Sequence, residues 1–244
     1  MKAIILAAGK GERLRGTLNN IPKPMVEING KPILEHNILL LKKYGITDIY
    51  INLHHQPDVI RKRFGNGEKY GVNIKYSYEE TLLGTAGAVR KIADEYWNRK
   101  ECFILLYGDN LYKYDLQEII NFHIEKKGIA TIALYEKHEV SQSGIVVLDK
   151  DNKILKFIEK PRPEEAVSNL VNTGIYILEP DVLAYIPSRK ALDFGRDVFP
   201  ELIEKGEDIF GVMVKGKLTA IDTPELLKEA LRTTKTDNGY RREE

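Results

Sequence analysis

Short apolar runs alternate with segments of helical periodicity through the first half of the chain. β-Branched and aromatic runs bounded by turn residues predict strands, and apolar residues recurring every three or four positions predict helices. The predicted strands are Lys2–Ala8, Ile46–Leu53, Val72–Tyr78 and Cys102–Tyr107, and the predicted helices are Pro32–Tyr44, Asp58–Phe64, Gly84–Trp97 and Leu116–Lys127. This alternation predicts an α/β fold with a mainly parallel sheet between helices, and ligands bind such sheets at the carboxyl ends of the strands.

The pattern changes after a strand predicted at Ile129–Tyr135. Shorter strand-like runs follow, and a turn at Asp149–Lys153 joins the first two as a hairpin. These runs are Gly144–Leu148, Ile154–Ile158 and Val171–Leu178, and after them come helices at Val182–Ile186 and Arg196–Lys205, a strand at Ile209–Val214 and a helix from Pro224 to about Thr233. We expect one domain over residues 1–235, an antiparallel insert or lid over about 139–180, and a polar tail at 236–244.

Composition narrows the class of protein. The chain has 244 residues, 43% of them hydrophobic, which is enough for a full core in one α/β domain. Its 37 basic and 36 acidic residues give a net charge of +1, which offers no support for binding nucleic acid or an anionic membrane. Neither a signal peptide nor a bilayer-spanning stretch is evident, so we predict a cytoplasmic protein. The possibility of a homo-oligomer stays open.

Cysteine and histidine give little sign of chemistry. Cys102 is the only cysteine, so an intrachain disulfide is excluded, and its apolar surroundings favour a buried residue over a nucleophile. The five histidines lack the spacing of metal ligands, so no metal site is predicted for them.

A glycine-rich basic loop follows the first strand. Gly9, Lys10 and Gly11 come directly after the apolar run, with Arg13 and Arg15 close behind. Glycines let backbone N–H groups approach a bulky anion, and arginine forks suit phosphate, so the predicted ligand is a polyphosphate. A P-loop requires Ser or Thr after the Gly-Lys pair, and a dinucleotide fingerprint requires glycine where this chain has Leu14; neither motif is present.

What remains is L-A-A-G-x-G-x-R-L followed by Pro22-Lys23-Pro24. This combination resembles the opening signature of the sugar-1-phosphate nucleotidyltransferases. The resemblance implies a Rossmann-like three-layer nucleotide-diphospho-sugar transferase fold, with a mixed, mainly parallel sheet and a small antiparallel sugar-binding lid. It also implies that Arg13 and Lys23 hold the triphosphate. Nucleotide contacts are implied for Leu6, Ala7, Ala8, Gly9, Gly11, Gly84 and Thr85. For Gly84, close packing of the helix is the alternative role.

Asp109 follows the buried run that ends at Tyr107, so it is expected at the same sheet edge as Gly9. A carboxylate beside phosphates needs a cation between them, and Mg²⁺ bound by one or two carboxylates plus substrate oxygens suits such a site. The resemblance likewise makes Asp109 a metal ligand. The family's usual second aspartate is replaced by Ala220, so we assign the second metal contact to Asp222, for which an N-cap of the last helix is the alternative.

The sugar side of the site follows from the same resemblance. It implies that Glu159 binds sugar hydroxyls, that Lys160 places the incoming phosphate as a catalytic group, and that Asn172 and Gly174 line the sugar pocket. A strand that ends or bulges is required if adjacent Glu159 and Lys160 are to reach one ligand.

The expected reaction joins a nucleoside triphosphate and a sugar 1-phosphate, with release of pyrophosphate. The segment around Gly84 most resembles that of the mannose-1-phosphate guanylyltransferase branch of the family, and this resemblance implies GTP and mannose 1-phosphate. Glucose 1-phosphate with UTP or dTTP, a CTP-dependent enzyme, and a non-catalytic subunit that only binds a sugar nucleotide remain alternatives. The chain lacks the hexapeptide repeat of longer relatives, so we expect a single activity.

Overall fold

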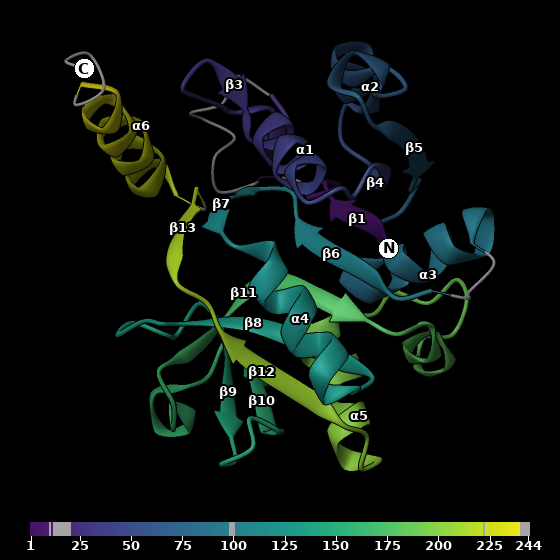
Figure 1. Cartoon of the computed structure of the whole chain (residues 1–244), viewed down its shortest axis with the longest axis vertical. Helices are drawn as coiled ribbons and strands as arrows, with labels where there is room; N and C mark the ends of the chain where they lie inside the picture. The colour runs from purple at the N-terminus through teal and green to yellow at the C-terminus, as the bar shows by residue number, and fades with distance from the viewer. Residues whose placement is uncertain (10, 12–20, 98–100, 222, 240–244) are drawn as a thin grey trace.

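The computed structural model describes residues 1–9, 11, 21–97, 101–221 and 223–239. A nine-stranded mixed sheet forms its centre (Figure 1). Along the sheet the order is β10-β9-β11-β6-β1-β4-β5, while β8 pairs with β11 and β12 pairs with β8. The strands are β1 (Lys2–Leu6), β4 (Asp48–Leu53), β5 (Asn73–Tyr78), β6 (Phe103–Tyr107), β8 (Ala130–Glu136), β9 (Gly144–Leu148), β10 (Ile154–Glu159), β11 (Leu170–Leu178) and β12 (Ile209–Met213).

The amino-terminal half of the sheet is parallel, as predicted. β1 lies between β6 and β4, and β5 pairs with the far side of β4. At the carboxyl end Leu6 is in register with both Tyr107 and Asn52. The loops that follow β1, β4 and β6 therefore leave the sheet at one edge, where the sequence places the predicted phosphate and metal ligands.

Helices cover both faces of the sheet. α1 (Ile33–Lys43), α2 (Pro57–Phe64) and α4 (Leu116–Lys126) share one hydrophobic cluster, and α3 (Gly84–Tyr96) and α5 (Phe199–Glu204) share another. Because side chains alternate along a strand, Ile5 of β1 packs in the first cluster and Ile4 in the second. The predicted three layers are confirmed.

The antiparallel strands extend this sheet at one edge. β9 and β10 form the predicted hairpin, and the carboxylate of Asp149 accepts backbone hydrogen bonds from Asp151 and Lys153 at its turn. Val171 of β11 is in register with Ile145 of β9, so the hairpin continues the central sheet.

Several elements differ from the sequence prediction. The helix predicted at Val182–Ile186 is a 3₁₀ helix, η5 (Pro180–Tyr185), which ends one residue earlier. The segment predicted as helix from Arg196 divides into a π-helix, η6 (Phe194–Val198), and α5. Pro200 lies in the first turn of α5 and carries no N–H, so it cannot continue the preceding hydrogen-bonded turns. Shorter elements are η2 (Lys23–Met25), β2 (Glu27–Ile28), β3 (Lys31–Pro32), η3 (Glu68–Tyr70) and η4 (Pro163–Glu165).

A small separate sheet was not predicted. β7 (Asn110–Tyr114) pairs antiparallel with β13 (Gly216–Ala220). Beyond it lies α6 (Pro224–Gly239), which continues past the predicted end near Thr233 (Figure 1). Leu227 and Ala230 of α6 pack in a cluster with Ile28 and Leu111, so this helix stands on the small sheet and not on the central one. Among the described residues, no helix combines the length and the apolar character needed to cross a membrane.

Candidate active site

An ion pair lies at the carboxyl edge of the parallel strands. Nζ of Lys23 in η2 is 2.7 Å from Oδ2 of Asp109, which follows β6. Lys23 is only 7% exposed, and a buried ammonium group requires such a partner. Gly108 lets the chain approach β1 closely, because its N–H donates to the carbonyl of Leu6 and an added Cβ would lie 2.8 Å from that oxygen. The structure thus brings together the predicted phosphate ligand Lys23 and the predicted metal ligand Asp109.

A buried polar chain orders the loops around this pair. The Asn52 side chain accepts a hydrogen bond from the N–H of Ala7 (2.7 Å) and donates to Oε1 of Glu79 (2.8 Å). Oε2 of Glu79 accepts from the N–H of Leu83 (2.9 Å). The end of β1 is therefore tied to the segment before Gly84. Sequence reasoning missed Asn52 and Glu79, because Asn52 is one polar residue inside an apolar strand.

The glycine loop itself is described only in part. Ala7 and Ala8 are buried, and an added Cβ on Gly9 would meet open space. Gly11 has a φ of 58°, which favours glycine. Arg13 lies outside the described residues, so its predicted role stays a prediction.

The Gly84 segment packs closely against the chain at residues 190–193. Gly84 has a φ of 70°, and an added Cβ would lie 2.5 Å from the carbonyl oxygen of Leu192. The Thr85 hydroxyl accepts from the N–H of Phe194 at 2.8 Å and lies 3.3 Å from Oδ1 of Asp193. Close packing therefore accounts for Gly84, and the predicted nucleotide contacts of Gly84 and Thr85 stay predictions.

A cavity of about 300 Å³ lies on the sugar side of the site. Three predicted sugar-binding residues, Glu159, Asn172 and Gly174, line it together with Asn110, the neighbour of Asp109. The other lining residues are Tyr107, Tyr135, Lys137, Glu139, Gln142, Ser143, Gly144, Thr173, Leu218, Ala220, Thr223 and Leu226. The cavity thus combines acceptors, amides and hydroxyls suited to a polar ligand with several hydroxyls.

A bulge in β11 fixes the Asn172 amide. The pairing of β11 with β8 is interrupted between Asn172 and Tyr176, and Gly174 there has a φ of 81°. Oδ1 of Asn172 accepts from the N–H of Gly174 and Nδ2 donates to the Tyr176 hydroxyl, both at 2.7 Å. Among the described residues Nδ2 has no second acceptor, so its other hydrogen can serve a ligand in the cavity.

Two glycines make room for the Glu159 carboxylate. An added Cβ on Gly144 would lie 2.7 Å from Oε2 of Glu159, and one on Gly195 would lie 2.8 Å from it. Burial raises the pKa of Glu159 above its ordinary value, although nearby Lys160 and Arg196 oppose this shift. Gly144 and Gly195 were missed by sequence reasoning, since neither stands in a glycine motif.

The raised pKa predicts a pH-dependent gain in stability for Glu159→Gln. A proton binds this carboxyl more tightly in the folded state, so its stabilising effect is full at low pH and is lost as the pH rises through the raised pKa. Glutamine has no such loss. We therefore expect Glu159→Gln to unfold at a higher temperature than the parent protein at pH 7 but not at pH 4. Exposed Glu204 provides the control Glu204→Gln. Equal unfolding shifts at the two pH values would contradict the prediction.

Two lysines, Lys160 and Lys137, lie in different positions relative to this cavity. β10 ends at Glu159 as required, and Lys160 follows with a φ of 52°. Lys160 is exposed and does not line the cavity, so its phosphate role stays a prediction. Lys137 does line the cavity, with Nζ 3.3 Å from the Ser143 hydroxyl. It follows a strand in the sequence without any motif that would have revealed it.

The second metal position is incomplete among the described residues. Ala220 is in register with Asn110, the residue after Asp109, and its methyl side chain offers no ligand atom. Asp222, the predicted substitute, lies outside the described residues.

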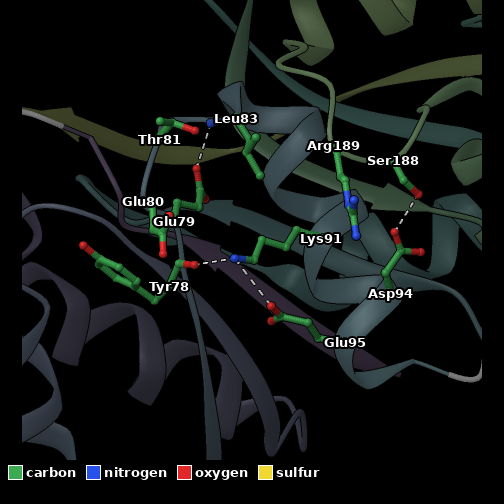
Figure 2. Close-up of a pocket in the computed structure, with 10 residues that line it drawn as sticks. All are labelled: Tyr78, Glu79, Glu80, Thr81, Leu83, Lys91, Asp94, Glu95, Ser188 and Arg189. Carbon is green, nitrogen blue, oxygen red and sulfur yellow. Dashed lines mark hydrogen bonds and ion pairs between the residues drawn. The ribbon is translucent and has the colours of Figure 1, made fainter.

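A larger cavity, of about 830 Å³, lies along α3 beside Leu83. Figure 2 shows Arg189 on one side of it, with Lys91 contacting the Tyr78 carbonyl and Glu95. Of the predicted site residues that the structure describes, none lines this larger cavity. Only Leu83, the residue before Gly84, borders it.

Residues 2–223 match the family described as Nucleotidyl transferase. The chain belongs to this family. It is 42% identical over 223 residues to the UTP–glucose-1-phosphate uridylyltransferase of Synechocystis sp., covering 87% of this chain and 58% of that protein. It is 38% identical over 211 residues to the mannose-1-phosphate guanyltransferase of Debaryomyces hansenii, covering 85% and 57%. The chain therefore spans less than two thirds of the length of these curated family members.

Solved structures of similar fold cover nearly the whole chain. A Bacillus anthracis protein assigned as a glucose-1-phosphate thymidylyltransferase, in complex with a sucrose, has a TM-score of 0.86 at 25% identity and covers 96% of this chain and 95% of its own. HddC from Yersinia pseudotuberculosis, complexed with GMP-PN, has a TM-score of 0.79 at 27% identity and covers 95% and 98%. The predicted fold of the nucleotidyl transferase family is thus confirmed.

Proposed function

We propose that this nucleotidyl transferase family member transfers a nucleotidyl group from a nucleoside triphosphate to a sugar 1-phosphate. The observation that carries the proposal is the ion pair between buried Lys23 and partly exposed Asp109 at the carboxyl edge of β1 and β6, beside the cavity lined by Glu159 and Asn172. A cationic group beside an anionic edge suits a triphosphate, and the neighbouring amide and carboxylate suit sugar hydroxyls.

The reaction balances without a protein nucleophile. An oxygen of the sugar phosphate attacks the α-phosphorus of the nucleotide, and the bond from that phosphorus to the oxygen bridging to the β-phosphate breaks, releasing pyrophosphate. Such a displacement needs alignment of the two phosphates and neutralisation of their charge. Lys23 supplies a fixed positive charge at the edge where the glycine loop begins, and the polar chain through Asn52 holds that edge in place.

Asp109 fits the role of a Mg²⁺ ligand. Its side chain is 33% exposed, Oδ2 faces Lys23, and Oδ1 makes no hydrogen bond or ion pair to the described residues. One carboxylate oxygen together with substrate phosphates is a common ligand set for this ion, which when bound neutralises phosphate charge. We assign the second contact to Asp222, as the sequence suggests.

For the substrates we propose GTP and mannose 1-phosphate. Two observations support this pair: the sequence of the segment around Gly84, and the mannose-1-phosphate guanyltransferases among the similar proteins. The uridylyltransferase at 42% identity supports UTP and glucose 1-phosphate as the alternative. Ala220, which pairs with Asn110 and carries no carboxylate, favours a second candidate function, a subunit that binds a sugar nucleotide without turning it over.

A matrix of substrates tests the proposal. Pyrophosphate release would be measured with Mg²⁺ for GTP, UTP, dTTP, CTP and ATP against mannose 1-phosphate and glucose 1-phosphate. We expect the highest kcat/KM for GTP with mannose 1-phosphate and loss of turnover in EDTA. A maximum with UTP and glucose 1-phosphate would overturn the substrate pair but not the reaction. Nucleotide binding by calorimetry without turnover in any combination would favour the non-catalytic candidate.

A further inference from the structure

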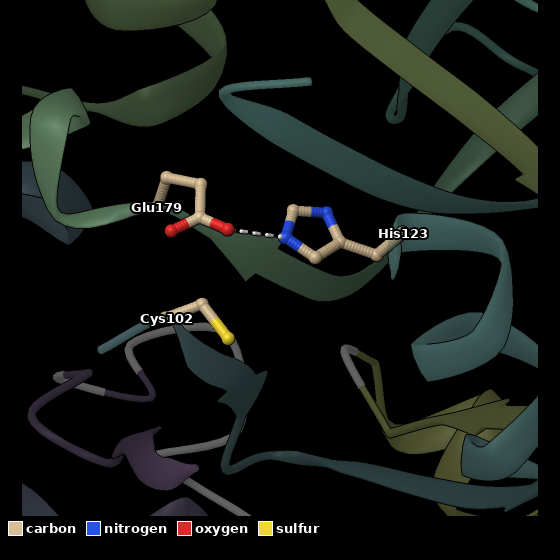
Figure 3. A group of neighbouring side chains, drawn as sticks. All are labelled: Cys102, His123 and Glu179. Carbon is tan, nitrogen blue, oxygen red and sulfur yellow. Dashed lines mark hydrogen bonds and ion pairs between the residues drawn. The ribbon is translucent and has the colours of Figure 1, made fainter. Parts of the chain in front are cut away.

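Cys102, His123 and Glu179 meet at the edge of the sheet opposite the candidate active site. Their possible ligand atoms all lie within 4.8 Å of one another, and Nε2 of His123 is 3.2 Å from Oε1 of Glu179. Figure 3 shows the Glu179 carboxylate directed toward the imidazole of His123, with the Cys102 side chain beside them. The sequence predicted no metal site among the histidines, because spacing along the chain does not reveal this convergence.

From this arrangement we infer that Cys102, His123 and Glu179 form a binding site for a zinc-class divalent cation. Thiolate, imidazole and carboxylate are all ligands of Zn²⁺, with bonds of about 2.0–2.3 Å. Tetrahedral geometry with such bonds places nitrogen and oxygen ligands about 3.3 Å apart, and sulfur and nitrogen about 3.6 Å apart. The His123–Glu179 separation of 3.2 Å already agrees, and Sγ of Cys102 lies within 4.8 Å of both other ligand atoms, so binding would draw it closer.

The three ligands stand on elements that hold them in place. Leu178 of β11 is in register with Phe103 of β6, so Glu179 and Cys102 come from the ends of paired strands. His123 reaches them from α4, where it is 2% exposed. These elements also belong to the central sheet and its covering layer, which limits the cost of ordering the ligands on binding.

The Thr131 hydroxyl can hydrogen-bond to His123 both with and without a bound metal. Nδ1 of His123 lies 2.9 Å from Oγ1 of Thr131, which is fully buried on β8. A hydroxyl both donates and accepts, so it can donate to Nδ1 while Nε2–H contacts Glu179, and it can accept from Nδ1–H when Nε2 carries the metal. Outer contacts of this kind orient metal-bound histidines in proteins.

A cavity of about 560 Å³ borders this cluster at Glu179, which is the side from which a cation would enter. Glu179 lines it together with Asp181, Glu207 and Asp208, and Lys127 is the basic residue on its wall. Two of these carboxylates already have partners, because Lys153 pairs with Asp208 and the Tyr185 hydroxyl donates to Glu207. Glu179 and Asp181 are therefore the carboxylates that an incoming cation would meet first. A water molecule entering through this cavity would supply the fourth ligand.

The site is structural in character. Cys102 precedes β6 and Asp109 follows it, so the two lie about 20 Å apart along the strand at ordinary strand rise. A cation bound by Cys102 would join β6, β11 and α4 and stabilise the folded chain, without contact with the reacting phosphates.

Cobalt spectroscopy tests the inference independently of catalysis. Because Cys102 is the only cysteine, a sulfur-to-cobalt charge-transfer band in the near ultraviolet reports that residue alone. We expect Co²⁺ added to the reduced, chelator-treated protein to saturate this band at one equivalent, and Zn²⁺ to abolish it. Zn²⁺ at 100 times its Kd is expected to raise the unfolding temperature by about 5–10 °C.

Matched variants decide the outcome. Cys102→Ser is expected to lose the band, and Glu179→Gln, which retains a hydrogen-bond partner for His123, is expected to weaken Zn²⁺ binding at least about tenfold. His138→Gln changes an exposed histidine outside the cluster and is expected to bind as the parent protein does. Absence of the band in the parent protein, or equal Zn²⁺ affinity in the parent protein and Glu179→Gln, would overturn the inference.

Discussion

Lys23→Ala is expected to reduce pyrophosphate release by about a hundredfold or more while the protein remains folded. The ammonium group is fixed by its 2.7 Å contact with Asp109 and is nearly excluded from water, so its charge acts on phosphate without reorganisation of solvent. Loss of one preorganised electrostatic group commonly costs about 10²–10³ in turnover. Asp109 retains access to water at 33% side-chain exposure, so removal of its partner leaves no fully buried charge.

The measurement is kcat for pyrophosphate release, with circular dichroism and thermal unfolding as checks on the fold. Lys31→Ala is the matched control, because Lys31 carries the same charge eight positions along the chain, in β3, but is exposed. Its turnover is expected to equal that of the parent protein. A folded Lys23→Ala protein with turnover within a few-fold of the parent would remove Lys23 from the mechanism.

Much of the fold and part of the site follow from the sequence alone. The apolar runs that become β1, β4, β5 and β6 are bounded by clear turn residues, so local pattern suffices to place them. Parallel strands present their carboxyl ends together, which is why a basic motif after β1 and an acidic motif after β6 could be expected to meet. The Lys23–Asp109 contact joins residues 86 positions apart and agrees with that expectation.

What the sequence did not reveal depends on contacts between distant segments. β7 and β13 are short, partly polar runs that become strands only because they pair with each other. Asn52 contacts Ala7 and Glu79 across 45 and 27 positions, and no local pattern marks a polar residue that orders two loops. The same holds for Cys102, His123 and Glu179, whose convergence depends on the β6–β11 register and the placement of α4.

The Glu159 region shows how tertiary packing determines chemistry. The motif Glu-Lys-Pro marks both charged residues equally, yet the end of β10 sends them to different surroundings. Glu159 is partly buried between two glycines, whereas Lys160 is exposed. Two adjacent residues of one motif therefore have different environments. The difference arises from the packing of Glu159 against Gly144 and Gly195, which the motif does not reveal.

Asp109→Asn is expected to reduce turnover by about a hundredfold or more and to raise the Mg²⁺ concentration needed for half-maximal activity. Asparagine preserves the shape of the side chain and an acceptor for Lys23, but it removes the negative charge that a hard cation prefers. Two effects then combine, since phosphate charge is less well neutralised and the Lys23 ammonium loses its counter-charge in a nearly dry position.

A magnesium titration of pyrophosphate release separates these two effects, with Asp58→Asn as the control because the Asp58 side chain is 95% exposed. If Asp109 only positions Lys23, Asp109→Asn lowers kcat and leaves the half-saturating Mg²⁺ concentration unchanged, which would contradict its assignment as a metal ligand.

The double variant Lys23→Ala with Asp109→Asn adds a second criterion. Residues that act as one unit give non-additive losses, so the double variant is expected to be little worse than the poorer single variant. Fully multiplicative losses would instead mean that Lys23 and Asp109 act on the substrate independently, despite their contact.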